Sequence, residues 1–399
     1  MFGRGTLFCA GAAVASRLGA SAFADFSYLA LTSATLTAYF SVGAGTAITR
    51  YVAIMPEARA ASGNAPLAAA ALLGVLGGVL ALALLAAFPG AFMPNSVIHL
   101  KAPLMAAFAA QMLGGMTLSA LAGRRQFVLA ACANLCGGVV LIITALFGIL
   151  KNAPVVVIWA IPASQFSLLL VTTVAAWKLV FFEAHGVGLR AAFRHMSAVL
   201  KFAAPMFVIS LLASSGPWAL SLLLVRSDKA EFAAFSAGLQ WFSLVLVIPG
   251  AVSSAYLPRL FQQSSMGHSL PSAQVNYTIR ANVLQSLFIA LAVAVVILPL
   301  APILLRFHGE VLRGRISTFA AFVFTGVLAA VTNPIGNGLV ARNGQLTWLR
   351  LTFVWLAAVL LTALLGGRAT AFSASLDLCA GYVVLLGMSM PMLRSAAAR

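Results

Sequence analysis

The chain consists largely of apolar runs that are long enough to cross a lipid bilayer. The run AALLGVLGGVLALALLAAF at 70–88, for example, contains no charged residue. A helix needs about 20 such residues to cross the hydrocarbon core. Lipid offers no hydrogen-bond partners to the backbone, and a helix satisfies its backbone N–H and C=O groups internally. The pattern predicts an all-α polytopic membrane protein with spans at 5–17, 26–48, 66–90, 102–122, 127–149, 154–177, 203–225, 232–254, 283–305, 317–340, 346–366 and 370–392.

The balance of charges excludes a soluble domain and a nucleic-acid partner. Only 8% of the residues are charged, whereas a soluble domain carries about a quarter. The net charge of +17 and the pI of about 11.1 are typical of a nucleic-acid-binding protein. The basic residues, however, stand singly at the ends of apolar runs, which is where membrane proteins place them.

The first span is shorter than the others. Only about a dozen apolar residues separate Arg4 from Arg17, too few for a full crossing. The segment is either a half-span or the remainder of a helix whose start codon was assigned too late, and we favour the second interpretation. It runs into further membrane segments without the cleavage site of a signal peptide.

The distribution of Lys and Arg predicts that both termini are cytoplasmic. With the N-terminus inside, 15 of the 24 basic residues fall on the cytoplasmic side. The longest polar link, 178–202, falls on that side as well. Its apolar residues recur at helical spacing and its basic residues occupy other faces, so we expect an amphipathic helix on the inner leaflet; a plain tether is the alternative. This cytoplasmic linker separates an N-terminal six-helix lobe, 1–177, from a C-terminal six-helix lobe, 203–399.

The two halves contain an internal repeat. Residues 21–50 align with 230–259 without a gap, and AGRRQF at 122–127 aligns with ARNGQL at 341–346. Because six spans return the chain to the same side, the two lobes are predicted to be parallel copies related by an axis along the membrane normal. Such lobes enclose a central cavity that can open to either side, which favours a carrier that functions as a monomer.

In RLGASAFADFSYLAL (17–31), GAGTAITRYVA (43–53) and LKFAAPMFVISLL (200–212), the chain resembles polysaccharide flippases, the O-antigen and exopolysaccharide branch of the multidrug/oligosaccharidyl-lipid/polysaccharide exporter superfamily. The first two helices of that family are similar to RLGASAFADFSYLAL (17–31) and GAGTAITRYVA (43–53). The opening of its seventh helix is similar to LKFAAPMFVISLL (200–212), and its eighth helix is similar to the run from Phe232 to Phe261. The resemblance covers nearly the whole chain, although each motif is loose.

The resemblance implies translocation of undecaprenyl-diphosphate-linked oligosaccharide repeat units across the bacterial inner membrane. A polysaccharide polymerase and chain-length machinery would then be partners, beside membrane lipids. Lipid II flippases are similar, but they commonly place arginines in the second helix, where this chain has Thr37, Ala38 and Tyr39. The incomplete first helix is a further departure, because family members usually have a complete one.

The cargo of such a flippase needs cations for its diphosphate. The repeat-equivalent residues Arg50 and Arg259 are the candidates for the inner mouth of the cavity, and Arg17 for the outer mouth. Ordinary positive-inside anchoring is the alternative for all three.

Uncharged and acidic residues within the spans supply further candidates. Gln240 and Asn333 are candidates for binding glycan hydroxyls, although amides between helices more often bond each other. Asp377 is an intramembrane carboxylate and therefore a candidate coupling site, unless Arg368 pairs with it in a structural salt bridge.

Signals for an enzyme, a cofactor or a bound metal are absent. The chain has neither a P-loop nor an HExxH motif, and Cys132 and Cys136 are more typical of packing than of metal binding. Two alternatives to the flippase remain. A cation-coupled drug exporter of the same superfamily generally carries acids inside the helices of its first lobe, and the spans predicted for that lobe here contain none. A membrane-embedded polymerase or glycosyltransferase would need a long catalytic loop outside the membrane, and the outer links are short.

Overall fold

The structure is a computed structural model that describes residues 2–54, 65–177, 188–265, 272–342, 344–367 and 369–395. Its regular elements in these ranges are all helices, which confirms the predicted fold class. Ten helices are long and apolar enough to cross a membrane, or eleven if one bent pair counts as a single span. The elements are α1 (Phe2–Ile54), α2 (Ala65–Ala87), α3 (Pro89–Phe92), η1 (Asn95–Leu100), α4 (Lys101–Gly123), α5 (Phe127–Leu150), α6 (Pro154–Ala176), α7 (Leu189–Ser227), α8 (Lys229–Val245), α9 (Val247–Ser265), α10 (Ser272–Ile297), α11 (Ala301–Leu304), η3 (Leu305–Val311), α12 (Ile316–Ala341), α13 (Gln345–Gly366) and α14 (Ala371–Ser395).

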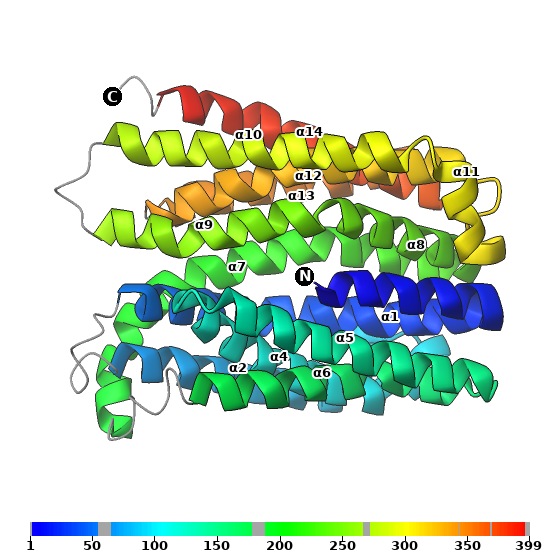
Figure 1. Cartoon of the computed structure of the whole chain (residues 1–399), viewed down its shortest axis with the longest axis horizontal. Coiled ribbons are helices and arrows are strands. Elements are labelled where there is room, and N and C mark those ends of the chain that lie inside the picture. Colours follow the sequence, from blue (N-terminus) through cyan, green and yellow to red (C-terminus); the bar gives the residue numbers. More distant parts are fainter. Residues whose placement is uncertain are drawn as a thin grey trace.

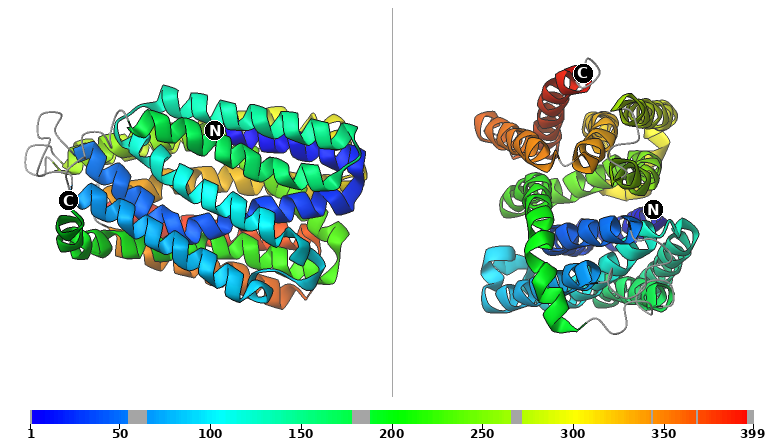
Figure 2. Two further views of the ribbon diagram at one scale, coloured as in Figure 1. Left: turned by 90° about the horizontal axis from the view of Figure 1, so that it is seen from below. Right: turned by 90° about the vertical axis from the view of Figure 1, so that its left-hand side faces the viewer.

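The helices form two lobes that lie side by side with their long axes roughly aligned (Figure 1). The N-terminal lobe comprises α1 to α6, and the C-terminal lobe comprises α7 to α14; Figure 2 shows the two groups along these axes. One end of the bundle, called the linker end, holds the end of α1 and the start of α7. The opposite end, called the Gly19 end, holds Gly19, η1 and η3.

Helix α1 contains two of the predicted spans, 5–17 and 26–48, joined by a sharp turn. Gly19 makes the turn with φ of 84°, a conformation that glycine adopts without steric cost. Segment 2–18 begins near the middle of the bundle and reaches the Gly19 end (Figure 1). From there, segment 20–54 runs back through the bundle to the linker end. The first segment packs closely on the N-terminal lobe, since a Cβ atom at Gly138 of α5 would stand 2.6 Å from Thr6 Cγ2.

The sequence repeat corresponds to equivalent core positions of the two lobes. Phe23 and Phe26 of α1, and their counterparts Phe232 and Phe235 of α8, are all fully buried. The second copy differs in being bent by 50° between α8 and α9. Pro249 lies in the first turn of α9 and lacks an N–H group, so it cannot continue the hydrogen-bond ladder of α8.

Helix α7 joins the predicted linker to the seventh span without a break. The described part of the predicted linker, 188–202, is therefore helical from Leu189 onward, and its first part, 178–187, lies outside the described residues. The start of α7 crosses the linker end of the bundle (Figures 1 and 2). Leu189 and Phe193 are exposed there, whereas Ala192 and Val199 are buried against the bundle. The chain can therefore enter the membrane as one continuous helix.

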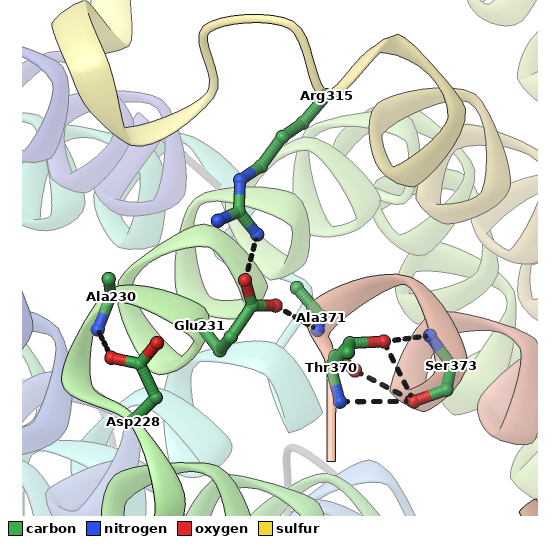
Figure 3. Close-up of polar contacts among 7 residues, drawn as sticks. All are labelled: Asp228, Ala230, Glu231, Arg315, Thr370, Ala371 and Ser373. Atoms are coloured by element: carbon green, nitrogen blue, oxygen red, sulfur yellow. Dashed lines mark hydrogen bonds and ion pairs between the residues drawn. The ribbon is translucent and has the colours of Figure 1, made fainter. Parts of the chain in front are cut away.

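Ionic contacts tie the helices together at the Gly19 end. Glu231 of α8 accepts a contact from Arg315 at 2.6 Å and a hydrogen bond from the backbone N–H of Ala371 at 2.7 Å (Figure 3). It thereby connects α8 to the residue that precedes α12 and to the first residue of α14. Between the lobes, Lys229 of α8 lies 3.9 Å from Asp25 of α1.

Candidate substrate cavity

A cavity of about 520 Å³ lies between α1, α4, α5, α6 and α8. Ligand sites typically enclose about 300–1,000 Å³. The described residues that line the cavity are uncharged, and the polar ones carry hydroxyl or amide groups: Ser27, Ser33, Thr37, Gln111, Asn134, Ser164, Gln165, Ser236, Gln240 and Ser243. The cavity therefore offers hydrogen bonds without a fixed charge.

The lining has the symmetry of the sequence repeat. Helix α1 contributes Ser27, Ala30, Leu31 and Ala34, and α8 contributes their exact counterparts, Ser236, Leu239, Gln240 and Ser243. These positions recur at the spacing of one helix face. The cavity thus lies where equivalent faces of the two lobes meet, although α4, α5 and α6 of the N-terminal lobe complete its wall.

Four polar atoms of the lining are buried and have no hydrogen-bond partner among the described residues. They are the hydroxyl oxygens of Ser27 and Ser236 and the amide oxygens of Gln111 and Gln240. Leaving a buried polar group unpaired costs about 1–3 kcal/mol. Other lining groups bond their own helices instead; Thr37 Oγ1, for instance, donates to Ser33 O at 2.8 Å. The four groups therefore leave hydrogen-bonding capacity unused in the wall of the cavity.

The short first segment of α1 contributes to the cavity. Leu7 lines it directly. Gly11 leaves space for Gln240, because a Cβ atom at position 11 would stand 2.5 Å from Gln240 Nε2. Segment 2–18 thus sets the position of a predicted binding residue.

A second, smaller pocket of about 390 Å³ lies in the C-terminal lobe where α8 bends into α9. Asn333 and Asn337 of α12 line it, opposite Ser253 and Ser254 of α9. Asn337 Nδ2 donates to Ser253 Oγ at 2.8 Å, while the side chain of Asn333 is exposed. This pocket also presents neutral polar groups, next to the bend.

The predicted site residues occupy separate places. Gln240 lines the first cavity and Asn333 the second. Arg50 is half-buried at the linker end, with its guanidinium 4.4 Å above the ring of Phe202, and Arg17 is exposed at the Gly19 end.

The other two predictions concern Arg259 and Asp377. Arg259 belongs to α9, but its side chain lies outside the described residues. Asp377 of α14 is half-buried near Thr362 of α13 and lines neither cavity. Its predicted partner, Arg368, also lies outside the described residues. No contact in the described structure tests the roles of these residues.

The comparison with solved structures identifies the architecture. The chain superimposes on a MATE protein in complex with MaL6 with a TM-score of 0.74 at 15% identity, covering 100% of this chain and 95% of that one. An outward-facing multidrug resistance MATE family transporter of the MOP superfamily gives 0.73 at 16% identity, with 99% and 92% covered. The chain has the fold of these transporters.

A lipid II flippase shares the same fold. MurJ in its inward closed conformation gives a TM-score of 0.70 at 13% identity, with 100% of this chain and 88% of MurJ covered. No protein-family model and no curated protein sequence matches the chain. The fold is therefore common to transporters with quite different cargo. The cargo of this protein has to be inferred from the residues that line its cavity.

Proposed function

We propose that the protein is a flippase that carries lipid-linked oligosaccharides across the bacterial inner membrane by alternating access. The observation that carries this proposal is the cavity between the repeat-related faces of α1 and α8, with its uncharged lining and unpaired amide and hydroxyl groups. Sugar hydroxyls are both donors and acceptors, so they can pair with serine hydroxyls and glutamine amides.

The diphosphate would be bound apart from the glycan. Arg50 follows Thr37 of the cavity lining by 13 residues on the same helix, roughly 20 Å at 1.5 Å per residue. Its guanidinium face lies on Phe202, an arrangement that leaves the N–H groups at its edge for a phosphate. We propose that the linker end is cytoplasmic, so that Arg50, with Arg259, receives the diphosphate where the cargo enters. Arg17 is the corresponding candidate at the exit.

An exporter of small apolar molecules is the second candidate function. Leu7, Leu31, Leu141 and Leu239 line the same cavity, and the MATE neighbours have the same fold. A cationic drug, however, would need a carboxylate within reach, and the described lining has none.

The experiment uses a strain in which the gene is deleted. We expect complete undecaprenyl-diphosphate-linked repeat units to accumulate on the cytoplasmic face, measured by mass spectrometry and by their accessibility in each leaflet. The intact gene clears them, and so does a control carrying Arg350→Ala, an exposed position of α13. Arg50→Ala combined with Arg259→Ala does not. Unchanged lipid-linked sugars in the deletion strain would refute the flippase, and clearance by the double variant would refute only the roles of the arginines.

A further inference from the structure

His308 occupies an unusual position at the junction of the two lobes. It belongs to η3 of the C-terminal lobe, which follows α11 and reaches α1 at the Gly19 end (Figure 1). Its side chain is 0% exposed. The ring centroids of Phe8 and Phe23 of α1 lie 5.3 and 6.3 Å from that of His308, and Trp241 of α8 lies at 5.9 Å. The imidazole is thus enclosed by aromatic rings from both lobes.

The neighbouring backbone confirms how closely η3 approaches α1. Gly309 has a φ of 57°, and a Cβ atom there would stand 3.3 Å from Ser16 Cα. The lobes cannot separate at this end without withdrawing η3 from α1. Such separation would expose His308 to water.

Neither ring nitrogen of His308 has a hydrogen-bond partner among the described residues. The charged groups on the elements packed around it are engaged elsewhere or exposed. Asp25 of α1 lies within 4 Å of His99 and Lys229, and Glu231 of α8 pairs with Arg315, which precedes α12. On η3 itself Glu310 pairs with Arg313 and Arg306 is exposed, as is Arg17 of α1. In the described part of the closed junction, no carboxylate is hydrogen-bonded to the imidazole.

We propose that His308 is a proton-binding site whose occupation is coupled to separation of the two lobes at the Gly19 end. The neutral imidazole fits the closed junction, and the protonated one requires the hydrated, open junction. This inference rests on the alternating-access part of the proposed function but not on the identity of the cargo. It places the proton site at the junction, away from Asp377 of α14.

The size of the coupling follows from the two environments. Burial lowers the pKa of His308 to about 4, from the 6.5 of an exposed imidazole. Protonation occurs more readily in the open state, so falling pH shifts the equilibrium toward opening. With these two pKa values, lowering the pH from 7.5 to 5 raises the open-to-closed ratio about 30-fold.

The experiment measures opening through a cysteine placed beneath η3. Ala15 is buried and its carbonyl lies near Gly309, whereas its neighbour Ser16 is exposed. In full-length protein in nanodiscs, with the four native cysteines replaced by alanine, Ala15→Cys and Ser16→Cys are each reacted with a hydrophilic maleimide. The ratio of the two rates removes the intrinsic pH dependence of thiol chemistry.

We expect the ratio to rise steeply as the pH falls from 7.5 to 5, and to stay flat with His308→Gln or His308→Phe. His99→Gln is the matched control, because His99 is an exposed histidine at the same end. A flat ratio in the chain that retains His308 would overturn the proposal without requiring any His308 variant to fold. So would a rise that persists in both His308 variants or disappears in His99→Gln. Because the assay contains no cargo, its failure leaves the assignment of cargo intact.

Discussion

Glu231 should contribute far more to stability than another glutamate at the same end of the bundle. The Glu231 carboxylate contacts Arg315 at 2.6 Å and accepts the N–H of Ala371 at 2.7 Å, and its side chain is only 18% exposed. Hydrogen bonds to charged groups contribute about 1.5–3 kcal/mol each. Arg315, at 32% exposure, can recover part of its hydration when Glu231 is removed. We therefore expect Glu231→Ala to lower the free energy of unfolding by about 2–3 kcal/mol.

Glu310 is the matched control for this prediction. It contacts Arg313 at 3.1 Å, but the two side chains are 87% and 80% exposed. Exposed ion pairs contribute about 0–1 kcal/mol, so Glu310→Ala should have little effect. Equilibrium unfolding in mixed detergent micelles measures both variants. A double-mutant cycle with Arg315→Ala isolates the contribution of the Glu231–Arg315 pair. Equal losses for the Glu231 and Glu310 variants would refute the reasoning.

Three further substitutions test the packing, each against a control position. Gly11→Ala should displace the flexible amide of Gln240 and lower transport several-fold with little change in Tm. Gly5→Ala, with open space at its Cβ position, should leave transport unchanged, and equal transport by the two variants would contradict the shape of the cavity. Gly238→Ala places a Cβ atom within 2.1 Å of the buried ring of Phe322 and should cost about 1–3 kcal/mol of unfolding free energy, while Gly387→Ala, which meets nothing within 4 Å, should cost none. Tyr28→Phe removes a hydrogen bond of 2.6 Å to Phe92 O and should lower the unfolding free energy by about 1 kcal/mol, whereas Tyr277→Phe, at a 74% exposed position, should leave it unchanged.

Much of the fold could be predicted from the sequence because lipid imposes a simple constraint. Apolar runs of about 20 residues located the spans to within a few residues for α4, α5, α6, α12 and α13. The constraint is weaker where a helix leaves the hydrocarbon. Hydropathy could not show that α7 continues from Leu189 into the membrane, nor that α10 ends at Ile297, several residues before the predicted boundary of 305.

The candidate site was predicted only in part. Gln240 was identified because an amide in an apolar run is conspicuous. Ser27 and Ser236 were aligned by the repeat, but serine is common in membrane helices, and nothing local distinguishes a serine that faces a cavity from one that bonds its own helix. The alignment contained the missing signal, since the positions flanking both serines at helical spacing line one cavity.

His308 shows the limit of reasoning from chain position. The sequence places all five histidines in links between spans, and links are usually exposed. Here the link η3 packs against α1 of the other lobe, and its histidine is fully buried. Contacts between lobes depend on tertiary structure, and they cannot be predicted from hydropathy.

Transport of a defined lipid-linked sugar by the purified protein tests the central claim most directly. The protein is reconstituted into liposomes that contain an undecaprenyl-diphosphate-linked oligosaccharide in both leaflets. Oxidation of the exposed sugars by impermeant periodate then reports how fast the sugars of the inner leaflet appear outside. We predict rapid, protein-dependent transfer that Gln240→Leu slows, because Gln240 lines the cavity and its amide oxygen has no partner in the described structure. Transfer no faster than in protein-free liposomes, together with protein-dependent movement of a cationic dye, would contradict the flippase and favour the exporter.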